Sequence, residues 1–74
     1  MEYKFIIKKR YDNGIVNVLK EGVTEDYITA FEETITEHSS LSSECILRNI
    51  TDYGRGYFSF RVWDYSYTLE IFKM

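Results

Sequence analysis

Two side chains in this sequence have the chemistry of a catalytic nucleophile or base, His38 and Cys45. A Ser–His or Cys–His enzyme needs a third group to orient the base, and no Asp or Glu stands near His38 in a recognisable motif. We expect His38 at the C-terminus of a helix, where a cation compensates the helix dipole. Cys45 has neither a CxxC partner nor a helix N-terminus to activate it, which indicates a small buried apolar residue. We therefore predict no catalytic residue and no enzyme.

Metal and cofactor sites are not predicted either. One cysteine and one histidine lack the ligand spacing of a zinc site, and the carboxylates do not follow a calcium-loop pattern. Gly54-Arg55-Gly56 is similar to a fragment of a phosphate-binding loop, but we expect it between two strands, so no helix N-terminus would follow to bind an anion. The expectation is no metal and no cofactor.

Charge is distributed unevenly along the chain. The 74 residues include 9 Lys and Arg and 12 Asp and Glu, a formal charge of −3. Residues 1–22 have five cations against three carboxylates, and residues 45–74 have four against three. Residues 23–44 have six carboxylates and neither lysine nor arginine. A helix is predicted in this acidic stretch.

The helical period places these carboxylates on one surface. With Ile28, Phe31 and Ile35 turned toward the core, a period of about 3.6 residues directs the carboxylates away from it. The predicted acidic face, a partner-binding site, comprises Asp26, Glu33 and Glu37, flanked by Glu25 and Glu32. Like charges a turn apart repel by a few tenths of a kcal/mol per pair, roughly. We interpret that cost as a sign of contact with a basic protein surface, and a merely solubilising face is the other interpretation.

Aromatic residues are concentrated between residues 53 and 74, which contain eight of them. Alternation along two predicted strands places Tyr57, Trp63 and Phe72 opposite the core positions. We expect these three rings on the uncovered face of a sheet, where they would bind a partner or a second copy in a homodimer. The alternative is a sheet that curls and covers the rings itself.

The elements that position these residues follow from periodicity and turn signals. We predict a hairpin over residues 3–20, a helix over 24–38 with Thr24 as N-cap, a Ser-rich connector over 39–43 and a three-stranded meander over 44–73, whose first strand is 44–50. Residues 1–74 then form a single α+β domain. It is a small two-layer domain of order ββαβββ, with a mostly antiparallel five-stranded sheet packed on one helix.

Two registers are possible for the hairpin. A two-residue turn at Asn13-Gly14 pairs Lys9 with Val18, whereas a three-residue turn with a bulge pairs Lys9 with Asn17. The second register also pairs Tyr11 with Ile15 and Ile7 with Leu19. We favour it because it gathers most of the apolar residues on one side and turns two valines outward. The predicted core side comprises Tyr3, Phe5, Ile7, Tyr11, Ile15 and Leu19, and the outward valines are Val16 and Val18.

The function predicted from these features is protein binding. The chain has no apolar run long enough for a membrane span or a secretory signal, and a single cysteine suits a reducing compartment, so we expect a soluble, cytoplasmic protein. In size, acidity and single-domain organisation it is similar in general character to inhibitors encoded by phages and mobile elements, including anti-CRISPR proteins. That resemblance implies a non-enzymatic inhibitor that covers a basic, nucleic-acid-binding surface of a partner protein.

Two alternatives remain at the level of sequence. One is a single-stranded nucleic-acid-binding module that combines cations of the hairpin with aromatic rings of the sheet. Its residues would be Lys4, Lys8, Arg10, Tyr57, Arg61 and Trp63. The net charge of −3 makes nucleic acid the less favoured partner. The other alternative is a small accessory subunit or dimerising domain.

Overall fold

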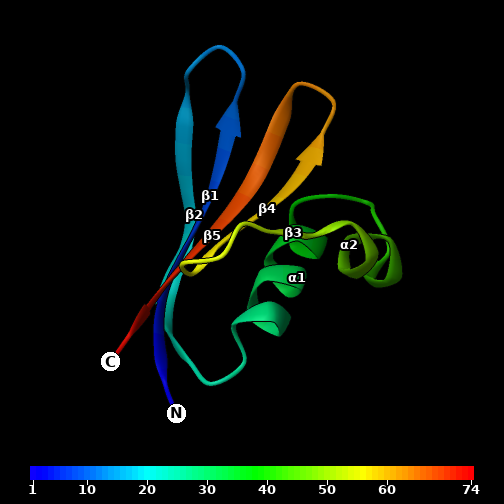
Figure 1. Ribbon diagram of the computed structural model, residues 1–74. Helices are drawn as coiled ribbons and strands as arrows, with labels where there is room; N and C mark the ends of the chain where they lie inside the picture. The colour runs from blue at the N-terminus through cyan, green and yellow to red at the C-terminus, as the bar shows by residue number, and fades with distance from the viewer.

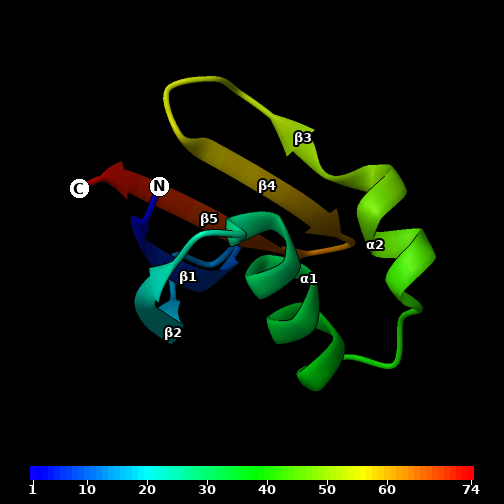
Figure 2. The same ribbon diagram turned by 90° about the horizontal axis from the view of Figure 1, so that it is seen from below.

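The computed structural model describes all 74 residues, Met1–Met74. Its elements, in chain order, are β1 (Tyr3–Tyr11), β2 (Val16–Thr24), α1 (Tyr27–Glu37), α2 (Ser43–Asn49), β3 (Thr51–Asp52), β4 (Tyr57–Val62) and β5 (Tyr65–Lys73). The five strands form one antiparallel sheet of order β2-β1-β5-β4-β3, and α1 packs on one face of it (Figures 1 and 2). The predicted α+β fold with an antiparallel five-stranded sheet is confirmed. Neither helix has the length and apolar character needed to cross a membrane.

The core lies between α1, α2 and the helix-facing side of the sheet. Alternate residues of β1, β4 and β5 point to this side, as the period of a strand requires. They meet two buried residues of α1, Phe31 and Ile35, and one of α2, Ile46. The strand residues of this core are Phe5, Ile7, Phe58, Phe60, Tyr67 and Leu69. The opposite face of the sheet, which we call the outer face, has no helix over it (Figure 2).

The hairpin adopts the favoured turn but not the whole favoured register. Lys9 pairs with Asn17, and the Tyr11 amide donates to the Ile15 carbonyl at 2.8 Å. A second irregularity between Ile7 and Lys8 then shifts the ladder, so Ile7 pairs with Lys20 and not with Leu19. The bulge lets Leu19 pack against the core from the edge strand.

Exposure along the hairpin follows from where the helices end. Val16 and Val18 are exposed, as predicted. Ile15 is also exposed, which contradicts its predicted place in the core. The reason is that the hairpin tip extends past α1 and α2, so no helix covers it (Figure 1).

Helix α1 begins later than predicted. Its N-cap is Asp26, whose carboxylate accepts a hydrogen bond from the Thr29 amide at 3.1 Å. Thr24 was the predicted cap, but it is the last residue of β2 and pairs with Tyr3. Its hydroxyl accepts from the Asp26 amide at 3.1 Å and so shapes the turn that leads into the helix. The helix ends where predicted, with His38 as C-cap.

The largest correction concerns residues 44–50, which we predicted as a strand. Residues 43–49 form the helix α2, and the third strand is reduced to Thr51–Asp52. The Ser42 hydroxyl caps this helix by accepting from the Cys45 amide at 3.2 Å, and Glu44 pairs with Arg48 one turn later at 2.7 Å. These local helix signals, together with burial of Ile46, outweigh the strand preference of the isoleucines at 46 and 50.

Candidate interaction surfaces

Packing of α1 on the sheet determines which of its side chains face solvent. Phe31, Thr34 and Ile35 are buried, so the helix turns its other positions outward. Four residues of the acidic face are exposed and the fifth, Glu32, is half-buried. The exposed ones are Glu25, Asp26, Glu33 and Glu37. The residues of the predicted acidic face therefore lie in α1 or just before it, and most of their side chains are open to solvent.

No residue of the acidic face forms an ion pair. The four ion pairs of the molecule involve Glu44, Glu70 and Asp12 as carboxylates, none of which belongs to this face. Glu33 and Glu37 accept no hydrogen bond from any side chain or amide. Their charge is directed entirely to solvent.

Asp26 differs from its neighbours because it has a structural role. One carboxylate oxygen accepts from the Thr29 amide at 3.1 Å and the other from the Thr29 hydroxyl at 2.7 Å. The hydroxyl and then the amide hold the pKa of Asp26 below its ordinary value. Asp26 therefore stays ionised at neutral pH, but its hydrogen-bonding capacity is partly used by the helix.

Four cations of the sheet lie on the outer face, away from α1. The register of β1, β5 and β4 places Lys4, Lys8 and Arg10 on this side with Arg61. Three of these four pair with two carboxylates of the chain, Glu70 and Asp12, so the group keeps a net positive charge. The Lys8 ammonium lies 3.3 Å and the Arg10 guanidinium 3.9 Å from one Glu70 oxygen.

Arg61 forms the most specific of these pairs. Its two terminal nitrogens donate to the two oxygens of Asp12 at 2.9 and 2.7 Å. This fork lowers the pKa of Asp12 and raises that of Arg61. It joins the β1–β2 turn to β4, so Arg61 is held by its own chain.

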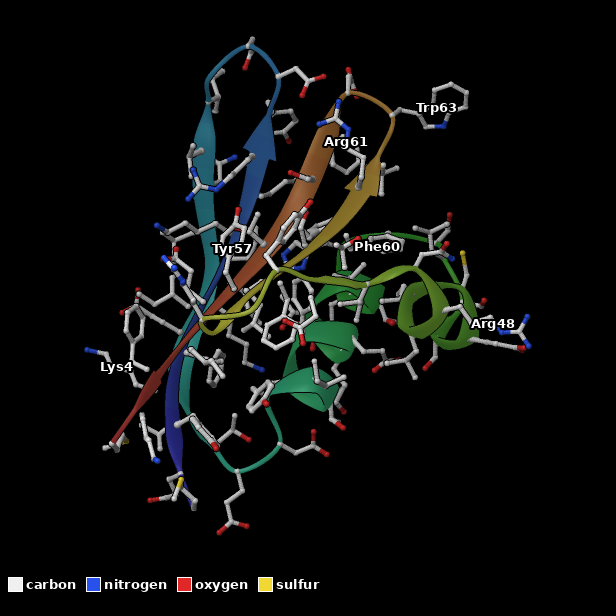
Figure 3. All side chains as sticks on the ribbon, in the orientation of Figure 1. Lys4, Arg48, Tyr57, Phe60, Arg61 and Trp63 are labelled. Atoms are coloured by element: carbon white, nitrogen blue, oxygen red, sulfur yellow. The ribbon has the colours of Figure 1, made fainter.

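The three predicted aromatic residues do not share one surface. Tyr57 and Phe72 both lie on the outer face, because Tyr57 pairs with Glu70, two residues before Phe72. Trp63 lies beyond the end of β4, at the tip of the β4–β5 turn, and is 92% exposed (Figure 3). Tyr57 is half-buried against Tyr53, with ring centroids 5.6 Å apart. The outer face thus carries the Tyr53–Tyr57 ring pair, and the indole of Trp63 lies apart from it at the tip of the β4–β5 turn.

His38 and Cys45 have no functional neighbours that would form a catalytic pair. The His38 ring nitrogen Nδ1 lies 2.8 Å from the Thr34 carbonyl oxygen, within its own helix. Cys45 is exposed in the first turn of α2, and both observations contradict the prediction of a buried residue on a strand. No group of three or more His, Cys, Asp or Glu side chains lies close enough together to hold a metal ion.

Lys9 belongs to a cluster that our sequence reading missed. It lies on the helix-facing side of β1, and its ammonium is 4.3 Å from the ring centroid of Tyr65, 5.1 Å from that of Tyr11 and 5.7 Å from that of Tyr67. The Tyr11 hydroxyl raises the pKa of Lys9, against a smaller lowering by burial. Burial raises the pKa of Tyr67. In the sequence, the alternation of residues 3–11 places Lys9 on the same side as apolar and aromatic residues, and this pattern was the signal that could have predicted the cluster.

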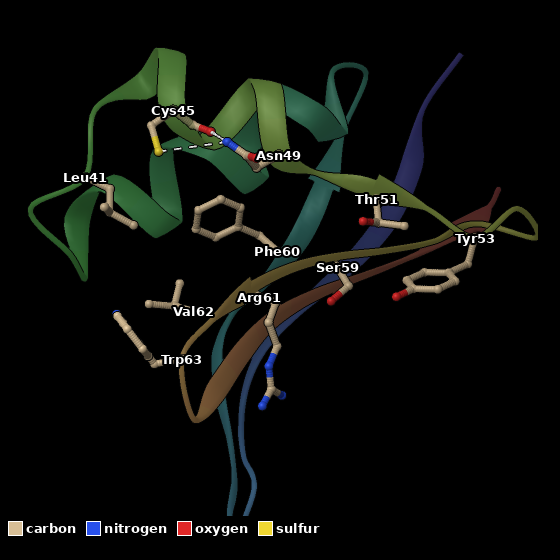
Figure 4. A pocket seen from close by; sticks show the side chains of 10 residues that line it. All are labelled: Leu41, Cys45, Asn49, Thr51, Tyr53, Ser59, Phe60, Arg61, Val62 and Trp63. Carbon is tan, nitrogen blue, oxygen red and sulfur yellow. Dashed lines mark hydrogen bonds between the residues drawn. The ribbon is translucent and has the colours of Figure 1, made fainter.

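A groove of about 410 Å³ lies between α2 and β4 (Figure 4). Phe60 and Val62 of β4 line one side, Cys45 of α2 lines the other, and Trp63 stands at one end. Our sequence reading could not place this groove, because it assigned the residues of α2 to a strand.

The geometry offers two surfaces that could contact a partner, the acidic face of α1 and the groove beside β4. They are built from different elements and differ in character, since one is acidic and the other has a mixed apolar and polar lining. Comparison of the chain with protein families, with curated proteins and with solved structures finds no match.

Proposed function

We propose that this protein is a non-enzymatic interaction module whose acidic face binds a basic surface on another protein. The observation that supports this is the absence of any ion pair on that face, although the chain contains 9 Lys and Arg. Glu33 and Glu37 are one helical turn apart, exposed and free of hydrogen bonds, so they can accept from Arg or Lys of a partner. A rigid group of carboxylates also speeds encounter with a cationic surface.

The partner class that fits this face best is a protein surface that normally binds nucleic acid. Such a surface presents several unpaired Lys and Arg side chains to phosphates. Occupation of those cations by the helix carboxylates would exclude the nucleic acid. In this role the protein is an inhibitor of the kind that phages and mobile elements encode.

A second candidate function is binding of single-stranded nucleic acid to the outer face. The sheet register favours it, because it gathers Lys4, Lys8, Arg10, Arg61 and Tyr57 on one side. The ion pairs weigh against it, since two carboxylates of this chain already pair with three of the four cations and reduce their net charge. We therefore place protein binding first.

The test reverses the charge of the acidic face and compares it with an equal change elsewhere. Wild type is used to capture its partner from a cell extract. The affinity of the purified partner is then measured by calorimetry for wild type, for E33K/E37K and for the control E2K/E21K. The control changes the net charge by the same amount at exposed residues outside α1. We expect about tenfold or greater loss for E33K/E37K, a smaller loss at high salt and little change for the control.

Two results would contradict the proposal. The first is equal affinity of E33K/E37K and wild type at low salt. The second is equal weakening by both charge reversals, which would show that net charge and not the helix face determines binding. Anisotropy of a labelled single-stranded oligonucleotide tests the second candidate, for which K4E should abolish any binding that wild type shows.

A further inference from the structure

The edge of the sheet beside β4 is only partly covered. β3 pairs with Phe58 and Ser59, and the chain on its N-terminal side leaves the sheet as α2. Val62 pairs with Tyr65 across the two-residue β4–β5 turn. Because hydrogen-bonding groups alternate along an antiparallel strand, the main-chain N–H and C=O of Phe60 and Val62 face β5. Those of Arg61 face the open edge. An open edge of this kind is a template for another strand.

The groove of about 410 Å³ lies along the same edge. In Figure 4 the side chains of Phe60 and Val62 rise from β4 on one side of it, and Leu41 and Cys45 face them from the connector and α2. A strand that paired with the edge would place alternate side chains into this space. Main-chain pairing and a partly apolar pocket are thus available together.

Trp63 at the end of the groove has a backbone conformation that the fold alone does not explain. Its φ is +47°, in the left-handed region, at the first position of a two-residue turn, where glycine is usual. Its side chain is 92% exposed, so the indole gains almost nothing from packing. A strained backbone that presents a bare indole is typical of a contact residue, and tryptophan is enriched among residues that dominate binding energy.

The charges around the groove define the chemistry of its occupant. Arg61 is the charged residue that lines it, and both oxygens of Asp12 already hold its guanidinium. Arg48 on the nearby surface of α2 pairs with Glu44 at 2.7 Å. The groove therefore has no unpaired cation for a phosphate, and its mixed apolar and polar lining matches an uncharged segment.

We infer that the open edge of β4 and its groove bind an extended, uncharged peptide segment of another protein. The segment adds as a strand beside Phe60–Val62, bonds to the main chain of Arg61 and packs an apolar or aromatic side chain against Trp63. This surface goes beyond the proposed function and is separate from the acidic face of α1. Either surface can therefore fail its test without affecting the other.

The chain provides two internal reporters for the test, because Trp63 and Cys45 are its single tryptophan and single cysteine, on opposite sides of the groove. A phage-displayed library of random peptides of about twelve residues is selected on wild type and counter-selected on W63G. Enriched peptides are synthesised with blocked ends and titrated. Tryptophan emission and the rate of Cys45 alkylation by iodoacetamide are recorded.

We expect enriched peptides to contain alternating β-branched or aromatic residues without charge. Binding should shift Trp63 emission to shorter wavelength and slow Cys45 alkylation. N-methylation of the peptide amides that face Arg61 should lower affinity about tenfold or more, and methylation of the intervening amides should not. W63G should keep or raise the melting temperature of the protein but lose affinity for the peptide. W63F should retain part of that affinity. The controls F72S and E33K/E37K should bind the peptide as wild type does.

Several outcomes would overturn the inference. They are failure to enrich any peptide that requires Trp63, unchanged alkylation of Cys45 when the peptide is bound, and equal affinity of the N-methylated forms. A shift of Trp63 emission on concentrating the protein alone would identify the occupant as a second copy and would also overturn it.

Discussion

The charged side chain of Lys9 stabilises the fold through contact with aromatic rings. Its ammonium lies within about 6 Å of three tyrosine ring centroids, the range in which a cation is attracted to the ring faces. This end of the sheet extends beyond α1 (Figure 1), so Lys9, Tyr11 and Tyr65 cover one another there, next to the buried ring of Tyr67. The lysine stem supplies apolar contact and the ammonium supplies the electrostatic part.

Removal of this lysine should destabilise the protein. We expect K9A to lower the free energy of unfolding by about 1–2 kcal/mol, because three rings share one cation at a partly exposed site. K9M, which keeps an apolar stem, should lose less. Urea unfolding followed by circular dichroism measures both, with the exposed Lys4→Ala as the control. A K9A value equal to that of K4A would show that the cluster contributes nothing.

The lowered pKa of Asp26 predicts that the protein loses part of its stability in acid. Its folded-state pKa is lowered by the hydrogen bonds from Thr29, so the stabilisation is present above the unfolded value of about 3.9 and is lost as pH falls through the folded value. Asn at this position keeps an acceptor for the Thr29 amide but has no charge to titrate. The difference in unfolding free energy between wild type and D26N should be constant above about pH 5 and shrink below it. If the difference in unfolding free energy stays the same in acid, the charge of Asp26 contributes nothing to the stability of the cap.

At the scale of elements, the β3–β4 connection depends on a close approach of two backbones. Gly56 has φ +75°, and a Cβ there would lie 2.9 Å from both the carbonyl oxygen and Cγ1 of Ile71. The Gly56 carbonyl also accepts from the Ile71 amide at 2.9 Å. Gly54 has nearly the same φ, +78°, with no atom within 4 Å of its Cβ position. Gly54 is therefore a control for Gly56, because both have a left-handed φ but only Gly56 closely approaches another strand.

G54A should cost about 1–2 kcal/mol of stability, the price of a left-handed alanine. G56A should cost at least about 1 kcal/mol more, because the methyl group collides with backbone and the turn must move away from β5. Thermal unfolding of both variants gives the comparison. Equal losses would mean that the turn accommodates a side chain at Gly56 without strain.

Periodicity predicted the elements with long patterns and failed where the pattern was short. The stripe of Phe31 and Ile35 gave the helix and hence the orientation of the acidic face. Residues 44–50 form too short a segment for periodicity to distinguish a strand from a helix, and the Ser42 cap and the Glu44–Arg48 pair favour the helix. The groove depends on α2, so it could not be predicted. The position of Trp63 depends on a turn conformation that its sequence disfavours.

On the scale of the whole molecule, the sheet order brings together the residues that are farthest apart in sequence. β1 pairs with β5 along its full length, from Tyr3 with Lys73 to Tyr11 with Tyr65. The two ends of the chain therefore lie close together (Figure 1). This pairing closes the longest loop in the fold, and loop closure of that kind slows folding.

A circular permutant tests this consequence of the topology. Joining residue 74 to residue 1 through a short Gly/Ser linker and opening the chain between Ser39 and Ser40, in the connector from α1 to α2, converts the β5–β1 pair into a local hairpin and keeps the β1–β2 hairpin intact. We expect refolding to become about tenfold faster, since the closure entropy of the central pair falls. Stopped-flow circular dichroism measures the rate. An unchanged rate would indicate that the β5–β1 pair forms after the rate-limiting step.

The central place of β5 also affects how the protein is made. A ribosome synthesises residues 65–73 after every other strand, yet β5 supplies the partner edge for both β1 and β4. Until Lys73 has left the ribosome, the nascent chain holds two strands with unpaired edges and the aromatic residues of β4 without their cover. Local pieces such as the β1–β2 hairpin can form earlier, but the sheet cannot close. Through this interval the unfinished chain offers open strands to chaperones and to neighbouring nascent chains, so its exposure to aggregation is set by the rate of translation.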